Sequence, residues 1–127
     1  MSKERVYHPH RNPGFVTGAY SDGVLTDGFL FVSGQAAVDF NTSKFVLGSI
    51  EEETRLTLDN IKAIVEAAGM TMDNIVKCTV HLKDVNDFAR FNKVYAEYFP
   101  GIRPARTTVQ SVLLEGICVE IDCIAKK

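Results

Sequence analysis

Two stretches of the chain repeat their apolar residues at the spacing of an α-helix. The first begins at Ser49, where Glu52 completes the pattern of a capping box, and it ends at Gly69. Its apolar face consists of Leu58, Ile61, Val65 and Ala68. The second starts near Asn86 and stops at Pro100-Gly101. Its repeating side chains are Phe88, Phe91, Tyr95 and Tyr98. Each stretch predicts an amphipathic helix with one face turned to the core.

Shorter segments have the patterns of β-strands. Residues 75–83 alternate with a period of two. One predicted face of that strand is formed by Val76, Cys78, Val80 and Leu82. Residues 29–32 are a continuous apolar run, which is typical of a buried strand. Two further strands are expected at residues 106–113 and 117–124, joined by a short turn at Glu115-Gly116.

A hairpin is expected around residues 20–27, where Asp22-Gly23 and Asp27-Gly28 are turn signals. Strands interspersed with two long helices predict an α+β fold with one mixed sheet and both helices on one face. No repeat, linker or low-complexity tract divides the sequence. We therefore expect one domain over residues 1–127.

Charge and hydropathy narrow the classes of partner and location. The formal net charge of −2 lacks the basic excess of a nucleic-acid-binding protein, so we expect no nucleic-acid partner. No apolar run approaches the roughly 20 residues that cross a bilayer. Residues 1–11 are polar and lack the hydrophobic segment of a signal peptide. These features favour a cytoplasmic protein without a membrane partner.

The cysteines and histidines do not suggest a metal site. Cys78, Cys118 and Cys123 are odd in number and form no C-x-x-C pair. They lie in apolar segments, so we expect reduced thiols in the core. His8 and His10 have no further ligands at a recognisable spacing, which favours an exposed terminal segment.

The last two predicted strands carry the polar residues with most potential for chemistry. Arg106 and Thr108 share a face of the first strand, and Glu120 and Asp122 share a face of the second. An odd-length turn would place the two polar faces opposite each other. Such an arrangement is compatible with a solvent-exposed charged pair, and also with a guanidinium that binds a carboxylate. Ser33-Gly34 either presents a hydroxyl and open backbone to a ligand or is an ordinary end of a strand.

A series of short motifs follows one order along almost the whole chain. They are Gly18-Ala19-Tyr20, Phe31-Val32-Ser33-Gly34-Gln35, Thr57-Leu58-Asp59-Asn60-Ile61 with Ala67-Ala68-Gly69, Asn86-Asp87-Phe88, Pro104-Ala105-Arg106 and Val119-Glu120-Ile121. Together they resemble the motifs of the Rid family of reactive intermediate/imine deaminases, also called the YjgF family. The resemblance implies a chorismate-mutase-like α+β sandwich, and a homotrimer with pockets at the subunit interfaces.

The resemblance also implies which residues form the site. Arg106 corresponds to the family arginine that grips the substrate carboxylate, and Glu120 corresponds to the glutamate near the attacking water. The implied substrate-binding residues are Tyr20, Ser33, Gly34, Asn92 and Thr108. Thr108 stands where many members carry cysteine, and Ala19 stands where proline is common.

These correspondences imply hydrolysis of a small enamine or imine acid, such as 2-aminoacrylate, to a 2-keto acid and ammonia. Arg106 would orient the carboxylate and Glu120 would polarise water, with no metal or organic cofactor. The alternative is a non-catalytic trimeric protein that binds or senses a carboxylate ligand with the same residues. A ribonuclease activity, attached to some family members, is disfavoured by the acidic charge balance.

Overall fold

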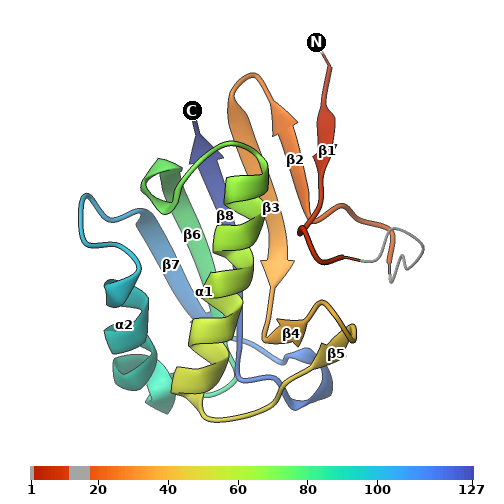
Figure 1. Ribbon diagram of the computed structural model, residues 1–127. Helices are drawn as coiled ribbons and strands as arrows, with labels where there is room; N and C mark the ends of the chain where they lie inside the picture. The colour runs from red at the N-terminus through yellow and green to blue at the C-terminus, as the bar shows by residue number, and fades with distance from the viewer. Residues whose placement is uncertain (1, 12–17) are drawn as a thin grey trace.

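The fold is described from a computed structural model that places residues 2–11 and 18–127. Within these residues, a six-stranded mixed sheet has the strand order β1-β2-β3-β8-β6-β7, and helices α1 and α2 cover one face of it (Figure 1). The strands of this sheet are β1 (Glu4–Val6), β2 (Gly23–Thr26), β3 (Phe29–Gln35), β6 (Ile75–Leu82), β7 (Ala105–Gln110) and β8 (Val119–Lys126). The expected α+β class, with both helices on one face of a mixed sheet, is confirmed.

The remaining elements connect these strands. The helices are α1 (Ile50–Ala67) and α2 (Phe88–Glu97), and the short 3-10 turns are η1 (Met72–Asn74), η2 (Val85–Asp87) and η3 (Leu114–Gly116). A small separate hairpin of β4 (Val38–Asp39) and β5 (Lys44–Phe45), which the sequence pattern did not predict, follows β3 (Figure 1). No helix in the described part of the chain is long and apolar enough to span a membrane.

Helix α1 forms where the sequence predicts it. The Ser49 hydroxyl accepts a hydrogen bond from the Glu52 amide at 3.1 Å, and the Glu52 carboxylate accepts one from the Ser49 amide at 3.0 Å. This reciprocal capping box satisfies amides that have no partner inside the helix. Gly69 adopts φ +77°, the left-handed conformation that suits glycine just after a helix.

The core lies between the helices and the covered face of the sheet. Fully buried side chains come from both helices and from the central strands; they include Leu30, Leu58, Ile61, Val80, Phe91 and Ile121. Cys78 and Cys123 are buried free thiols, as expected. Cys118 departs from the prediction because it is only half-buried. Partial burial, followed by the nearby Glu53 carboxylate, raises the pKa of its thiol to about 11.

The predicted pairing of the last two strands is wrong. β7 pairs in parallel with β6, and β8 pairs antiparallel with both β6 and β3. β6 therefore separates β7 from β8, and Arg106 and Thr108 do not lie opposite Asp122 and Glu120. The physical reason is that β7 follows β6 through the α2 crossover, which places the two strands side by side in parallel.

Two smaller expectations also need correction. A bulge at the start of β6 breaks its alternation, so Ile75 is buried while Val76 is 48% exposed. Asp27-Gly28 does form the β2–β3 turn, with φ values of +52° and +78°. Asp22-Gly23 does not form a turn: Gly23 begins β2, and Asp22 is buried just before it.

The buried Asp22 carboxylate anchors the N-terminal segment. It accepts hydrogen bonds from the His8 amide at 2.9 Å and from two guanidinium nitrogens of Arg11 at 2.6 Å each. His8, expected to be exposed, is instead buried and stacks on Phe40 with ring centroids 3.9 Å apart. The prediction failed because the partners of these residues lie far along the chain and have no local pattern.

Replacing Asp22 by alanine should therefore destabilise the fold strongly. Removal of one partner leaves the Arg11 charge and the His8 amide without their acceptor, which typically costs about 3–5 kcal/mol for a buried pair. Urea unfolding at pH 7 measures this loss. The matched control is Glu97→Ala, which breaks an equally bidentate but half-exposed pair with Arg55 and should leave the unfolding free energy nearly unchanged. Equal effects of the two changes would contradict this account.

Candidate functional site

Arg106 lies beneath helix α2, on the covered face of the edge strand β7. Its Cα partner on β6 is Cys78, whose side chain points into the core. The guanidinium donates a hydrogen bond to Asn92 Oδ1 at 2.7 Å. It also lies 4.8–5.7 Å from the ring centroids of Phe88, Phe91 and Tyr95. Cation–π contacts of this kind hold the planar group in place without neutralising its charge.

No carboxylate in the described part of the chain forms an ion pair with Arg106. The interpretation of Arg106 as one member of a surface pair with Asp122 or Glu120 is therefore wrong for a single chain. A pocket of about 340 Å³ opens beside the guanidinium; it is lined by Asn92, Tyr95, Ala96, Arg103, Pro104 and Arg106. Burial raises the pKa of Tyr95, so its phenol stays neutral. The pocket thus offers positive charge to an anion.

Thr108 follows Arg106 on the same face of β7. Its hydroxyl oxygen is buried and has no hydrogen-bond partner among the described residues. Buried hydroxyls without a partner are costly and uncommon. Asn92, Arg106 and Thr108 together form what we call the clamp half of the candidate site.

Glu120 lies on the opposite, open face of the sheet. Its partner on β6 is His81, which is three residues from Cys78 and so points to the other side. The Glu120 carboxylate lies against Gly34, where a methyl group would come within 2.7 Å of Oε2. Gly34 therefore leaves the room that this carboxylate occupies.

A β-bulge between Val32 and Gln35 brings Ser33 and Gly34 to this position. The Ser33 hydroxyl donates to the Ser21 carbonyl at 2.5 Å, and the Ser33 amide donates to the Asp22 carbonyl at 2.9 Å. These bonds tie β3 to the segment that carries Tyr20. Tyr20, Ser33, Gly34 and Glu120 form what we call the acid half of the site.

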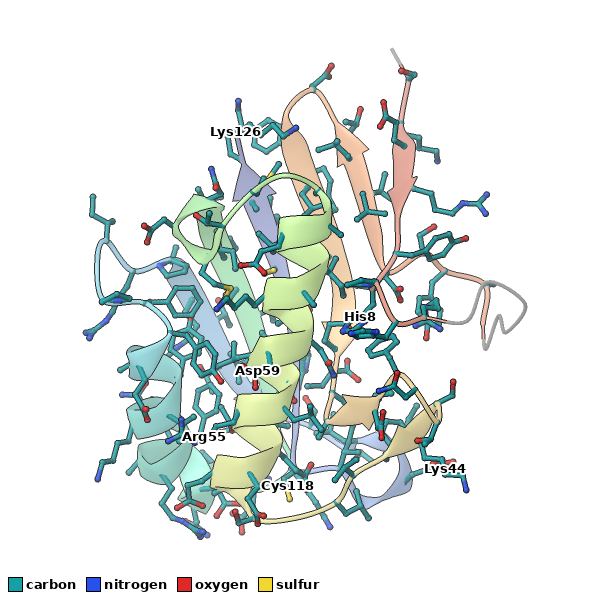
Figure 2. The ribbon with its side chains drawn as sticks, in the orientation of Figure 1. His8, Lys44, Arg55, Asp59, Cys118 and Lys126 are labelled. Atoms are coloured by element: carbon teal, nitrogen blue, oxygen red, sulfur yellow. The ribbon has the colours of Figure 1, made fainter. Side chains whose placement is uncertain are left out.

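The acid half opens into a larger pocket of about 790 Å³. Tyr20, Gly34 and Glu120 line one part of it, and the β4–β5 hairpin and the turn before β8 line the rest. Phe40 also lines this pocket, so the stacked His8 supports its wall from behind. Figure 2 shows His8 on the side of α1 away from α2, above the hairpin that carries Lys44.

The structure thus gathers the predicted residues into two groups rather than one. The clamp half is on the covered face of the sheet, and the acid half is on the open face. No described pocket contains both Arg106 and Glu120. Arg106 and Glu120 of one chain therefore do not share a pocket.

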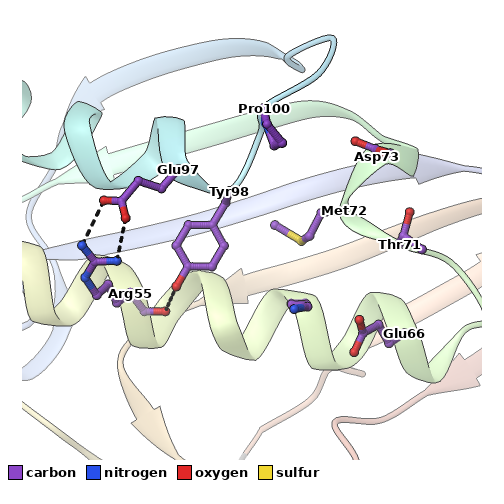
Figure 3. Close-up of a pocket in the computed structure, with 9 residues that line it drawn as sticks. Arg55, Glu66, Thr71, Met72, Asp73, Glu97, Tyr98 and Pro100 are labelled. Atoms are coloured by element: carbon purple, nitrogen blue, oxygen red, sulfur yellow. Dashed lines mark hydrogen bonds and ion pairs between the residues drawn. The ribbon is translucent and has the colours of Figure 1, made fainter.

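A third pocket, of about 460 Å³, lies between α1 and α2 and contains none of the predicted residues (Figure 3). Two of its lining residues, Arg55 and Glu97, form an ion pair at 2.9 Å. The hydroxyl of a third, Tyr98, donates a hydrogen bond to Asp59 of α1 at 2.8 Å. These contacts join the two helices, so we assign this region a structural role.

Sequence reasoning did not identify Arg11 or Phe40 as lining the larger pocket, or Asp22 as the partner of Arg11. Arg11 and Phe40 line the larger pocket, and the Arg11 guanidinium lies 4.8 Å from the Phe40 ring centroid. Nothing in the sequence near Arg11 distinguishes it from a surface residue. The only local sequence signal for this ion pair is the acidic residue Asp22, and Asp22 followed by Gly23 is equally typical of a turn.

Comparisons with known proteins bear on this arrangement. Residues 13–127 match the family model described as Endoribonuclease L-PSP. The fold also resembles a protein of unknown function of the conserved Rid protein family from Yersinia pestis, with a TM-score of 0.91 and 38% identity over 99% of this chain and 100% of that one. The chain belongs to the Rid family.

Curated relatives of this Rid protein have different names. A RutC family protein of Pyrococcus horikoshii is 48% identical over 111 residues, which are 87% of this chain and 88% of that protein. The rat 2-iminobutanoate/2-iminopropanoate deaminase is 43% identical over 109 residues, 85% of this chain and 80% of the enzyme. At least one relative of similar length is therefore named as an imine deaminase.

The buried His8 of this Rid protein should make its stability depend on pH. Burial, followed by the nearby His10, lowers the pKa of His8 below its ordinary value of 6.5, although Asp22 opposes the shift. The unfolded chain therefore takes up this proton more readily than the folded chain. The stabilisation is complete above pH 6.5 and is lost as the pH falls below that value.

Urea unfolding at pH 7.5 and pH 5.5 tests this expectation. The loss of unfolding free energy between these pH values should be smaller in His8→Gln than in the wild-type protein. His10→Gln, at an exposed neighbouring position, removes only the second cause of the shift and should retain most of the wild-type dependence. An unchanged pH dependence in His8→Gln would contradict the role given to this ring.

Proposed function

We propose that this Rid protein hydrolyses small enamine and imine acids, such as 2-aminoacrylate, to 2-keto acids and ammonia. The observation that carries the proposal is Arg106: a half-buried guanidinium held by Asn92 and three aromatic rings, with no described carboxylate to neutralise it. A planar guanidinium suits bidentate recognition of a substrate carboxylate. The named activity of the rat relative concerns 2-imino carboxylic acids, which agrees with this chemistry.

The reaction asks little of the protein beyond positioning. Arg106 orients the carboxylate, which fixes the neighbouring imine carbon. Glu120 accepts a proton from water as the water oxygen adds to that carbon. The nitrogen takes up this proton, and the adduct then loses its hydroxyl proton to the nitrogen as the keto C=O bond forms. The C–N bond breaks in the same step, and the nitrogen leaves as ammonia. The hydroxyl of Thr108 supplies a hydrogen bond on the clamp half, and Tyr20 and Ser33 wall the acid half.

We further propose that the active form is a homotrimer with each site at a subunit interface. Arg106 and Glu120 lie on opposite faces of one sheet, so the clamp half of one copy has to meet the acid half of another. The open face also carries Phe29 and Phe31, two exposed apolar residues whose ring centroids lie 6.2 Å apart. Contiguous apolar residues on an uncovered face favour association.

The proposed location is the cytoplasm. All three cysteines are free thiols, which reducing compartments maintain. The name of the matching family model suggests ribonuclease activity as an alternative function. The formal net charge of −2 does not favour a nucleic-acid substrate.

Arg106→Ala should abolish the acceleration of imine hydrolysis while the fold persists. Loss of a charge-assisted bidentate contact should reduce kcat/KM about 30- to several-thousand-fold, equivalent to about 2–5 kcal/mol. Arg106→Lys should restore little because a point charge cannot replace the planar fork. The assay adds the protein to a serine dehydratase and follows pyruvate release.

Arg90→Ala is the matched control, since Arg90 is an exposed arginine of α2 whose partner is Glu51. It should keep full activity, and the melting temperature of each variant checks folding. Full activity in Arg106→Ala would refute the assignment. Binding of 2-keto acids without any acceleration by the wild-type protein would instead favour a non-catalytic carboxylate-binding protein.

Mixing two inactive variants tests whether the site spans two copies. Arg106→Ala retains a wild-type acid half, and Glu120→Ala retains a wild-type clamp half. Trimers refolded from an equal mixture should regain about a quarter of the wild-type activity, since that share of interfaces joins two intact halves. Sedimentation should show a trimer. No recovery in mixed trimers, or a monomer at micromolar concentration, would contradict the interfacial site.

A further inference from the structure

The pocket beside Glu120 is larger than a three-carbon imino acid requires. At about 790 Å³ it falls within the range that holds drug-sized ligands. Only one part of it is lined by the acid half. We call the remaining part, beyond Gly34 and Glu120, the chamber. The proposed binding of the substrate carboxylate by Arg106 and activation of water by Glu120 use none of the residues that line the chamber.

The chamber is lined mainly by apolar side chains. On one side, β3 continues into the β4–β5 hairpin. On the other side are the loop before α1 and the turn before β8, which lies beside the hairpin in Figure 1. The apolar lining residues are Ala36, Val38, Phe40, Phe45, Leu47, Leu114 and Ile117. Leu47 reaches across to the turn, because a methyl group on Gly116 would lie 3.8 Å from its Cδ1.

Two buried polar side chains of α1 hold these walls in place. One Glu53 oxygen accepts from the Cys118 amide at 2.8 Å and the other accepts from the Gly48 amide at 3.1 Å. Asn60 donates to the Ala36 and Val38 carbonyls at 3.2 and 2.9 Å. Both walls are therefore fixed to the same helix, and the chamber is preformed.

The charges around the chamber disfavour a second carboxylate on the ligand. Glu115 and Glu120 both line the pocket. The charge of Arg11 is neutralised by the buried Asp22 at 2.6 Å. Lys44, on the hairpin (Figure 2), also lines the pocket and is its one cation without an ion pair among the described residues, so the two carboxylates outnumber it. A neutral, apolar group is the occupant that fits this lining.

We infer that the chamber is a side-chain subsite, and that this protein acts preferentially on 2-imino acids with long apolar side chains. The inference rests on the proposed function. In the reaction, water oxygen bonds to the imine carbon, the C–N bond breaks, and the products are a branched or aromatic 2-keto acid and ammonium. Each methylene placed in a hydrophobic pocket discriminates substrates by about 10-fold or more.

The test compares imines formed in place by an L-amino acid oxidase acting on alanine, leucine or glutamate. The measured quantity is the ratio of kcat/KM for the leucine-derived imine to that for the alanine-derived imine. It should be about 10 or more in the wild-type protein. The glutamate-derived imine should react more slowly than the leucine-derived one because of Glu115 and Glu120.

Leu47→Asp places a charge in the chamber and should lower the leucine-to-alanine ratio about 10-fold. Val46→Asp is the matched control: Val46 is the adjacent residue, 48% exposed against 56% for Leu47, and it does not line the pocket. It should leave the ratio unchanged. Leu114→Asp, in the turn before β8, should repeat the effect of Leu47→Asp.

The outcomes separate the two proposals. Acceleration of none of the imines would refute the proposed function itself. Equal acceleration of the alanine- and leucine-derived imines, with a ratio that Leu47→Asp does not change, would leave the deaminase in place and overturn the subsite. Preference for the glutamate-derived imine would also overturn it, since the chamber would then accept a second carboxylate.

Discussion

Strand β8 pairs with β3 along one edge and with β6 along the other, and this pairing determines where the polar residues of the sheet point. It keeps β7 away from β8, and it turns Arg106 towards α2 while Glu120 faces the open side. Among the described residues, Arg106 therefore has no carboxylate partner, and Glu120 does not share a pocket with it. The proposed interfacial site follows from this strand order more than from any single residue.

The sequence predicted the parts of the structure that depend on local spacing. The capping box at Ser49 and the Asp27-Gly28 turn involve residues a few positions apart, so their patterns are visible in the chain. The pairing of β7 was not visible, because the choice between β6 and β8 is decided by the α2 crossover. His8 and Asp22 were also missed, since their burial depends on contacts between segments far apart in sequence.

The same distinction applies to the candidate site. The family motifs named Arg106, Glu120 and their neighbours, but motif order carries no information about faces of a sheet. The structure adds that these residues form two groups, and it adds the chamber, whose apolar lining comes from two stretches far apart in the sequence, 36–47 and 114–117. Residues such as Leu47 and Ile117 have no chemical signature in sequence. Their convergence around one cavity is the basis of the role proposed for them in specificity.

The bulge in β3 makes chain length a constraint of its own. Ser33 and Gly34 together span the position opposite Asp122, which lets Val32 and Gln35 both face the core. Side chains alternate between the two faces of a strand. Deleting one of these two residues would therefore move the side chains at either the start or the end of β3 to the opposite face of the sheet. Residues 41–43, the exposed part of the loop between β4 and β5, carry no such requirement. Insertions and deletions among related chains should therefore collect in that loop and be absent from the five residues of the Phe31–Gln35 motif.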